Sequence, residues 1–390
     1  MEPARHAILG PSAATRWLNC TPSARFEEQV PDEESIYALE GTLAHSIAAT
    51  VLSARAGNWK GTQPEYLAVM DSLESQVGQF YELYPELTGS FEEMYEYAET
   101  WAAYLCELGG DILIEQEYDL SQYVPLGFGT ADATNITKKV LYVSDLKYGS
   151  GVKVGATGNS QLMLYGLGAL VKAVDLGHRP ETVVLTIYQP RAGGWPTWTL
   201  PVKDLLEWAE MEVRPKALKA ISGQGDFKVG TWCQFCKART VCSAYYEKYQ
   251  DVYTLFSTSD PRKMTPAQVA EVLEYGPLLA GWVEKVKAQA IADLQAGKTV
   301  QGFKLVNSKG RRGFINEDDV VDALIGADLD SEDIFKMELR SITDLEKQLG
   351  KKRFSSILGD LVIMKPGKET IAPADDARQP VGASAADEYD

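Results

Sequence analysis

Apolar and polar residues alternate near the middle of the chain in a pattern that predicts a β-hairpin. Val140–Val143 is an apolar run rich in β-branched residues, and the polar stretch Asn135–Lys139 before it has the composition of a turn. We expect Phe128–Ala133 to form the first strand of this hairpin. Two acidic residues, Asp132 and Asp145, then lie near the ends of the two strands, close to one edge of a sheet.

Further strands are predicted on both sides of the hairpin. Asp111–Asp119 alternates well enough to be a strand, with Glu115 and Glu117 on one face. Thr182–Pro190 has the pattern of a buried strand, and Trp195–Leu200 is expected to return antiparallel to it. Together with the hairpin these segments predict a central mixed sheet.

Apolar residues at helical spacing predict helices in the first third of the chain. Ser12 can cap a short helix that ends at Cys20, and a second helix carries His45. Residues 63–109 have a long amphipathic pattern, with Cys106 on its apolar face. A free cysteine in such a position is typical of core packing, and we interpret Cys106 in that way.

Helical patterns return after the hairpin. Gln161 and Tyr165 are four residues apart in an apolar helix and therefore share one face. Residues 203–222 predict another helix. Thr265 begins a capping box with proline at the first helical position, and this predicts a helix that ends near Ala296.

Strands enclosed by helices indicate an α/β fold with a central mixed sheet flanked by helices. Because 390 residues exceed what one hydrophobic core usually supports, we expect one large domain and a smaller one. The expected division is a domain at 1–250, a smaller and mainly helical α+β accessory region at 251–365, and a disordered acidic tail at 366–390.

Charge and hydropathy narrow the class of protein. The formal net charge of -17 argues against a protein that coats nucleic acid nonspecifically, which needs clustered Lys and Arg, but it leaves room for a nuclease with a local basic groove. No apolar run is long enough to span a bilayer, and the N-terminus lacks the apolar region of a signal peptide. We therefore expect a cytoplasmic protein with no membrane partner.

Cysteine spacing points to a metal site. Cys233 and Cys236 are three residues apart and can chelate one metal, Cys242 can add a third thiolate, and Cys20 is the candidate for the fourth. Zinc and iron–sulfur sites both use four thiolates, so the spacing leaves both open. Unligated thiols are the remaining alternative. An odd number of cysteines, without an export signal, argues against disulfides.

The two carboxylates of the hairpin suggest a second site. Asp132 and Asp145, joined by Lys147 on the same strand face as Asp145, suit a hard divalent cation and a positive charge that faces a phosphate. Taken singly, either aspartate is equally well explained by turn hydrogen bonds. His45 alone is more often an ordinary helix residue than a ligand, so the hypothesis depends on their joint occurrence.

The order of these residues resembles a known nuclease superfamily. The resemblance is to the RecB-like branch of the PD-(D/E)xK superfamily, and it covers roughly residues 9–246. Cys20, together with three cysteines near the end of this region, resembles the iron–sulfur version found in AddB-type helicase-nucleases and CRISPR adaptation exonucleases. Ala131 stands where the wider superfamily has proline. The shared motifs are Gly41-x3-His45, Asp132, Asp145-Leu146-Lys147 and Gln161-x3-Tyr165.

This resemblance implies a fold, an activity and cofactors. It implies a restriction-endonuclease-like core that hydrolyses DNA phosphodiesters with Mg²⁺ or Mn²⁺. His45, Asp132, Asp145 and the Leu146 carbonyl would hold the metal, and Lys147 would orient the water or stabilise the transition state. Gln161 and Tyr165 would position the DNA strand. Cys20, Cys233, Cys236 and Cys242 would hold a 4Fe-4S cluster, with zinc as the alternative. Between Glu115 and Glu117, we favour Glu117 as the additional strand carboxylate.

Stand-alone chains of this kind are typical of phage genomes. The resemblance therefore implies an exonuclease that generates single-stranded ends for recombination. Its expected partners are single-stranded DNA, or double-stranded DNA with free ends, and a recombinase or annealing protein. The competing hypothesis is a non-catalytic, metal-stapled scaffold, and the intact set of Asp132, Asp145 and Lys147 argues against it.

Overall fold

The computed structural model of the chain describes residues 7–30, 35–85, 87–149, 153–192, 194–258, 260–304, 306, 351–358 and 361. Contacts divide the chain into two compact units, Met1–Phe303 and Lys304–Asp390. In the second unit the helix α14 (Lys351–Leu358) is described, whereas the predicted tail at 366–390 lies outside the described residues. The architecture below is that of the first unit.

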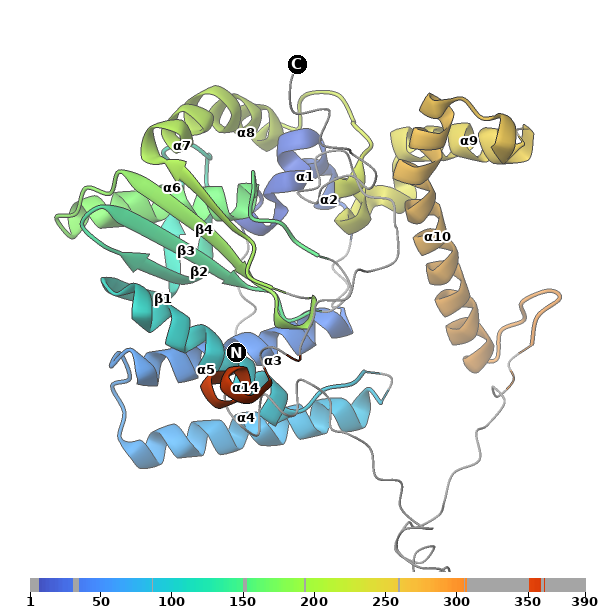
Figure 1. Ribbon diagram of the computed structural model, residues 1–390. Helices are drawn as coiled ribbons and strands as arrows, with labels where there is room; N and C mark the ends of the chain where they lie inside the picture. The colour runs from blue at the N-terminus through green and yellow to red at the C-terminus, as the bar shows by residue number, and fades with distance from the viewer. Residues whose placement is uncertain are drawn as a thin grey trace, which may run out of the picture. The chain divides into compact units, whose positions relative to one another are not determined.

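A five-stranded mixed sheet forms the centre of this unit (Figure 1). Neighbouring strands are antiparallel except for β3 and β4, which run parallel. Parallel neighbours need a crossover connection, and helix α6 (Ser160–Asp175) supplies it. In spatial order the strands are β1 (Asp111–Asp119), β2 (Phe128–Ile136), β3 (Val140–Leu146), β4 (Thr182–Tyr188) and β5 (Thr197–Pro201).

Helices cover both faces of the sheet and enclose two apolar cores (Figure 1). One core lies under α6, α1 and the α7–α8 segment and includes Leu164, Leu185 and Val213. The other lies under α3, α4 and α5 and includes Ile47 and Trp101. The helices are α1 (Ala14–Asn19), α2 (Ser23–Glu27), α3 (Ile36–Arg55), α4 (Gln63–Leu83), α5 (Phe91–Leu108), α7 (Val202–Trp208) and α8 (Arg214–Ile221), with a π-helical turn η3 (Ala209–Val213) between the last two.

Buried polar side chains fix the α5 layer to the sheet. The Trp101 indole donates to the Ser144 hydroxyl at 2.8 Å, and the Asn135 amide donates to the Leu105 carbonyl at 2.7 Å. All four residues are buried. Because a buried polar group without a partner is costly, these bonds fix both the register and the distance of α5 on β2 and β3.

The predicted α/β architecture is confirmed, with three local corrections. Strand β2 runs on to Ile136, so Asp132 lies in mid-strand and not near its end. Ser12 caps no helix, because it lies inside the 3₁₀ turn η1 (Pro11–Ala13), whose cap is Gly10. The amphipathic region 63–109 is two helices, each started by a side-chain cap, Thr62 for α4 and Ser90 for α5.

The cysteine segment and the helices after it complete the first unit. Two 3₁₀ turns, η4 (Thr231–Phe235) and η5 (Lys237–Val241), lead into α9 (Ser243–Thr258). Cys233 lies in η4, Cys236 lies between the two turns, and Cys242 follows η5. After the 3₁₀ turn η6 (Pro261–Lys263), the capping box of Thr265 begins α10 (Pro266–Gln295), as predicted. The predicted boundary at residue 250 falls inside α9, and the three-part division stays a prediction.

No helix in the described part of the chain combines the length and the apolarity that crossing a bilayer requires.

Two helical glycines allow a test of how tightly α6 packs on the sheet. A Cβ at Gly168 would lie 2.4 Å from the Tyr118 Cβ on β1, whereas a Cβ at Gly78, on α4, would meet nothing within 4 Å. We expect Gly168→Ala to lower the free energy of unfolding by about 1–3 kcal/mol through overpacking. Gly78→Ala should raise it by about 0.5–1 kcal/mol through helix propensity. Urea titration followed by circular dichroism measures both, and an equal effect of the two substitutions would contradict the packing.

Candidate active site and cysteine pocket

The candidate active site lies where the ladder between β2 and β3 ends. The last paired residues are Ala133 and Ser144, and the next residues on the two strands are Asp132 and Asp145. Beyond that pair the Leu146 N–H donates to Oδ2 of Asp132 at 2.7 Å, so a side chain takes the place of a ladder bond. This bond holds the Asp132 carboxylate beside Asp145, at the point where the two strands part.

His45, on helix α3, reaches Asp132 from the neighbouring helix layer. On α3 the nearby residues Ala44 and Ile47 pack into the core, and the imidazole Nδ1 of His45 lies 3.3 Å from Oδ1 of Asp132. Burial disfavours the charged imidazole, but the Asp132 carboxylate outweighs that effect and raises the pKa of His45 to about 9. Burial likewise opposes ionisation of Asp132, but the charge of His45, with that of Lys147 and the Leu146 N–H, lowers the pKa of that carboxyl below its ordinary value.

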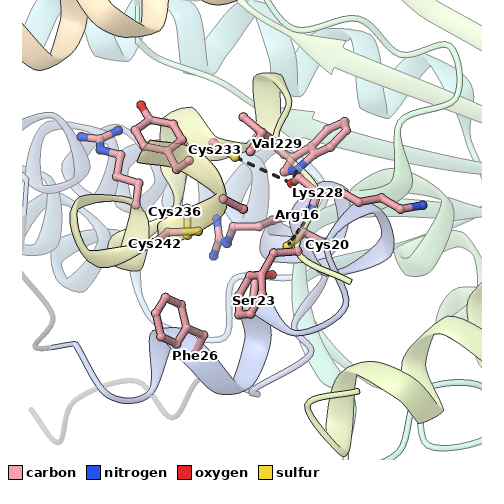
Figure 2. A pocket seen from close by; sticks show the side chains of 14 residues that line it. Arg16, Cys20, Ser23, Phe26, Lys228, Val229, Cys233, Cys236 and Cys242 are labelled. Atoms are coloured by element: carbon pink, nitrogen blue, oxygen red, sulfur yellow. Dashed lines mark hydrogen bonds between the residues drawn. The ribbon is translucent and has the colours of Figure 1, made fainter. Parts of the chain in front are cut away.

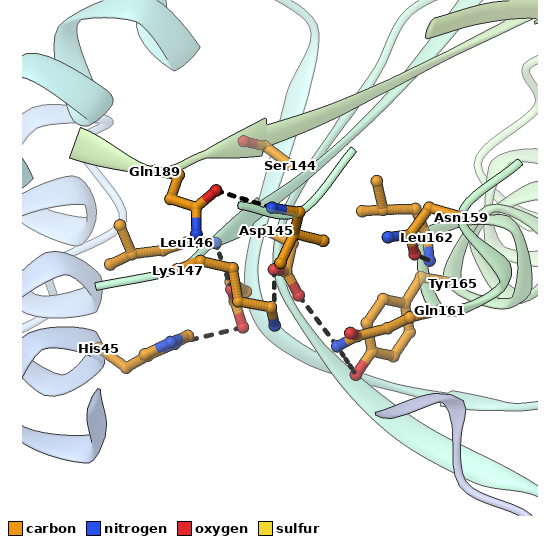
Figure 3. A network of polar contacts seen from close by, with 12 residues as sticks. His45, Ser144, Asp145, Leu146, Lys147, Asn159, Gln161, Leu162, Tyr165 and Gln189 are labelled. Carbon is orange, nitrogen blue, oxygen red and sulfur yellow. Dashed lines mark hydrogen bonds and ion pairs between the residues drawn. The ribbon is translucent and has the colours of Figure 1, made fainter. Parts of the chain in front are cut away.

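Asp145 is held by two partners on the other side of the site (Figure 3). Its side chain is only 2% exposed, Nζ of Lys147 lies 2.8 Å from Oδ2, and the Gln161 amide donates to Oδ1 at 3.0 Å. Burial and the nearby Asp132 charge raise the pKa of Asp145 despite the Lys147 ammonium. The Tyr165 hydroxyl accepts from the same Gln161 amide at 3.5 Å, so the predicted shared helix face is confirmed.

Glu115 joins this site through a strained backbone. Its neighbours Ile114 and Gln116 pair with Ala133 and Ala131, so Glu115 stands opposite Asp132. With a φ of +46° it adopts the left-handed region, which is rare for a non-glycine residue and costs on the order of 1–3 kcal/mol. Strain of this kind persists where the surroundings enforce it, and it is common at functional sites.

One atom each from His45, Glu115 and Asp132 lie within 4.8 Å of one another, a grouping that could hold a metal ion. Partial desolvation and then the Asp132 charge raise the pKa of Glu115 to about 7. The grouping contains Glu115 and not Glu117, so Glu115 replaces Glu117 as the candidate for the additional carboxylate. Alternation places both glutamates on one face, and only the backbone turn at Glu115, which no sequence pattern predicted, distinguishes them.

The carboxylates of Asp132 and Glu115 and the imidazole of His45 suit a hard divalent cation near Asp132. Carboxylate oxygens and an imidazole are ligands that Mg²⁺ and Mn²⁺ accept. Asp145 lies outside the close trio, and Lys147 and Gln161 engage its two oxygens. Its role as a metal ligand stays a prediction. Leu146 contributes its N–H to Asp132, and the predicted role of its carbonyl stays a prediction.

A cleft of about 740 Å³ opens on this site beside α3. Apart from His45 and Glu115, the cleft is lined only by small side chains. The cleft therefore leads to the side of the site that carries His45 and Glu115. The small lining residues are Ser12, Ala38, Gly41, Thr42, Ser46 and Ala49.

The four predicted cysteine ligands line one pocket (Figure 2). Cys20 comes from the end of α1, and Cys233, Cys236 and Cys242 come from the η4–η5 segment, more than two hundred residues later. Cys106 is not among the lining residues, in agreement with its interpretation as core packing. The Lys228 N–H lies 3.5 Å from Sγ of Cys20, as in a weak hydrogen bond to sulfur.

Burial favours the protonated form of three of the four thiols in this pocket. Burial raises the pKa of the Cys20 and Cys233 thiols, and burial with the Glu27 charge raises that of Cys236 to about 12. Thiols in this state become thiolates only when a metal binds them. Among the described residues, no three cysteine sulfurs lie within 4.8 Å of one another. Four thiolates on a single zinc would stand roughly 3.8 Å apart, because each Zn–S bond is about 2.3 Å.

Two comparisons with known proteins bear on the chain. Residues 6–379 match the model of a family described as "Protein of unknown function (DUF2800)". A solved structure titled "Crystal structure of SSO0001" is similar at 16% sequence identity and a TM-score of 0.25, over 44% of this chain and 81% of that chain. A likeness this slight has no bearing on function.

Two glutamates on one strand provide a matched test of the metal ligands. Glu115→Gln removes a carboxylate from the close trio and should weaken Mn²⁺ binding by about tenfold or more, since affinity follows the number of charged ligands. Glu117→Gln changes an exposed residue two positions along β1 and should leave the affinity unchanged. Isothermal titration with Mn²⁺ measures both, and equal affinities for the two variants would remove Glu115 from the ligand set.

Proposed function

The chain belongs to this family of unknown function, and we propose that it is a Mg²⁺- or Mn²⁺-dependent deoxyribonuclease. The observation that supports this most is the convergence of Asp132, Asp145 and Lys147 where β2 and β3 part, with His45 and Glu115 beside Asp132. Carboxylates and an imidazole on one side of a lysine suit a reaction in which negative charge develops on a phosphate.

His45, Glu115 and Asp132 would hold the metal, with Asp145 next to them. A bound divalent ion supplies polarisation of the scissile phosphate and lowers the pKa of the attacking water. Lys147, fixed by its 2.8 Å ion pair with Asp145, is placed to orient that water or to stabilise the negative charge that develops. Because Gln161 bonds both Asp145 and Tyr165, it keeps the helix face beside the reacting centre in one orientation.

The nucleic acid would approach along the cleft beside α3. The resemblance to RecB-like nucleases supports DNA as the substrate and degradation from a free end, with single-stranded ends as the product. We place this activity in the cytoplasm, in the host cytoplasm for a phage-encoded chain, with a recombinase or annealing protein acting on the product.

The four-cysteine pocket would hold a 4Fe-4S cluster. A single zinc ion is the alternative cofactor, because both groups are bound by four thiolates. Since Cys20 ends α1 and the other three cysteines follow α8, the cofactor would close a loop that contains the whole sheet. Its loss should therefore destabilise the entire unit.

Asp145→Asn tests the nuclease. The amide keeps the shape of the side chain but leaves Lys147 without its charge partner, and we expect cleavage of linear single- or double-stranded DNA to fall at least about a hundredfold. Gel assays with Mg²⁺, Mn²⁺ or EDTA measure the activity. Asp111→Asn is the control, because Asp111 is an exposed carboxylate of the same sheet that pairs with His178.

Wild-type protein without metal-dependent cleavage would point to the scaffold hypothesis instead. An Asp145→Asn variant as active as wild type would remove Asp145 from the reaction. A melting temperature measured on each variant separates loss of activity from loss of fold.

Cys233→Ala tests the cofactor. We expect this variant to lose bound iron and sulfide, and to melt at a lower temperature, because one of four ligands is missing. Cys106→Ala should retain both, since Cys106 is outside the pocket. Metal and sulfide analysis of anaerobically purified protein measures the outcome. Zinc without sulfide would support the zinc alternative, and unchanged metal content in Cys233→Ala would contradict a four-cysteine site.

A further inference from the structure

A buried arginine lines the cysteine pocket, and no motif predicted it. Arg16 lies on α1, one helical turn before Cys20, and its side chain is only 14% exposed. In Figure 2 its guanidinium points from the Cys20 side of the pocket toward Cys236 and Cys242. A permanent positive charge is thus enclosed among four groups that become negative when they bind a metal.

Two anchors hold the guanidinium in place. Its Nε donates to Oε2 of Glu27 at 2.6 Å, and its Nη1 donates to the Phe235 carbonyl at 3.0 Å. A guanidinium has five N–H groups, and no further hydrogen bond joins this one to the described residues. N–H groups on a fixed guanidinium therefore remain available to sulfur atoms in the pocket.

Glu27 connects the same pair to the cysteine segment. Its side chain is 10% exposed, and its second oxygen accepts from the Lys237 N–H at 2.8 Å, next to Cys236. Arg16 and Glu27 together are neutral, but they present opposite charges to the pocket. Each should therefore shift the energy of a negative cofactor in the opposite direction.

Net charge and hydrogen bonds to sulfur set the reduction potential of an iron–sulfur cluster. A 4Fe-4S cluster with four thiolates is an anion that becomes more negative on reduction. A nearby guanidinium favours the reduced form, whereas a nearby carboxylate disfavours it. Burial strengthens both effects, because the pocket is shielded from water.

We propose that Arg16 is the charge-compensating hydrogen-bond donor of the cofactor in the four-cysteine pocket, and that Glu27 positions Arg16 and limits its effect. This inference rests on the proposed iron–sulfur cofactor and is independent of the nuclease activity. Arg16 and Glu27 thereby tune the one-electron couple of the cluster.

Two neutralising substitutions distinguish tuning from a structural role. Arg16→Gln removes the positive charge and should lower the reduction potential, whereas Glu27→Gln leaves Arg16 without its carboxylate and should raise it. We expect each shift to be about tenfold in the ratio of oxidised to reduced cluster at a fixed potential, which is about 59 mV for a one-electron couple. Arg16→Lys keeps the charge and should lie nearer to wild type than Arg16→Gln.

The measurement is a dithionite titration of anaerobically purified, full-length protein, followed by electron paramagnetic resonance, with iron and sulfide content determined for each variant. Opposite shifts in Arg16→Gln and Glu27→Gln support the inference. Shifts in the same direction, or loss of cluster from both variants and from Arg16→Lys, would assign the pair a structural role and overturn it. Unchanged potentials overturn it as well. Wild-type protein that contains zinc and no sulfide overturns the cofactor together with the inference, whatever the nuclease assay gives.

Discussion

The hydrogen bond from the Leu146 N–H to the Asp132 carboxylate is the constraint on which the candidate active site depends. It stands where the ladder between β2 and β3 would otherwise continue, and it satisfies a backbone donor that the separating strands leave without a partner. Because Leu146 lies between Asp145 and Lys147, the same bond fixes the backbone from which both side chains project. A flexible loop could not hold two carboxylates and a lysine with this precision.

Charge balance explains how the two cations hold the two aspartates in position. If all five groups are ionised, three carboxylates face two cations, His45 and Lys147, and the site carries one net negative charge. Buried charges of this kind gain little net stability from their pairing, but removal of one partner is costly. His45 and Lys147 therefore hold Asp132 and Asp145 in position. A divalent ion near Asp132 would supply the positive charge that His45 otherwise places beside that carboxylate.

Sequence patterns predicted the sheet and most of the site because both depend on local signals. The β-branched run of β3, the apolar helix with Gln161 and Tyr165, and the spacing of the late cysteines each have a short-range physical cause. The sequence could not distinguish Glu115 from Glu117, because the position of Glu115 depends on a left-handed backbone, which neither residue type nor alternation encodes. Arg16 was missed because its partners, Glu27 and Phe235, become neighbours only when the η4–η5 segment folds against α1 and α2.

Helix α1 gives the two sites a common support. It carries Arg16 and leads directly to Cys20, and its Thr15 hydroxyl lies 3.0 Å from that of Ser160, at the start of the helix that carries Gln161. The turn before it packs on β2, where a Cβ at Gly129 would lie 2.6 Å from Pro11. Because β2 holds Asp132 three residues later, α1 and the turn before it contact the elements that carry both Asp132 and Gln161. A cofactor that fixes Cys20 to the end of the domain would therefore also limit the movement of the carboxylates, even though no cysteine belongs to that site.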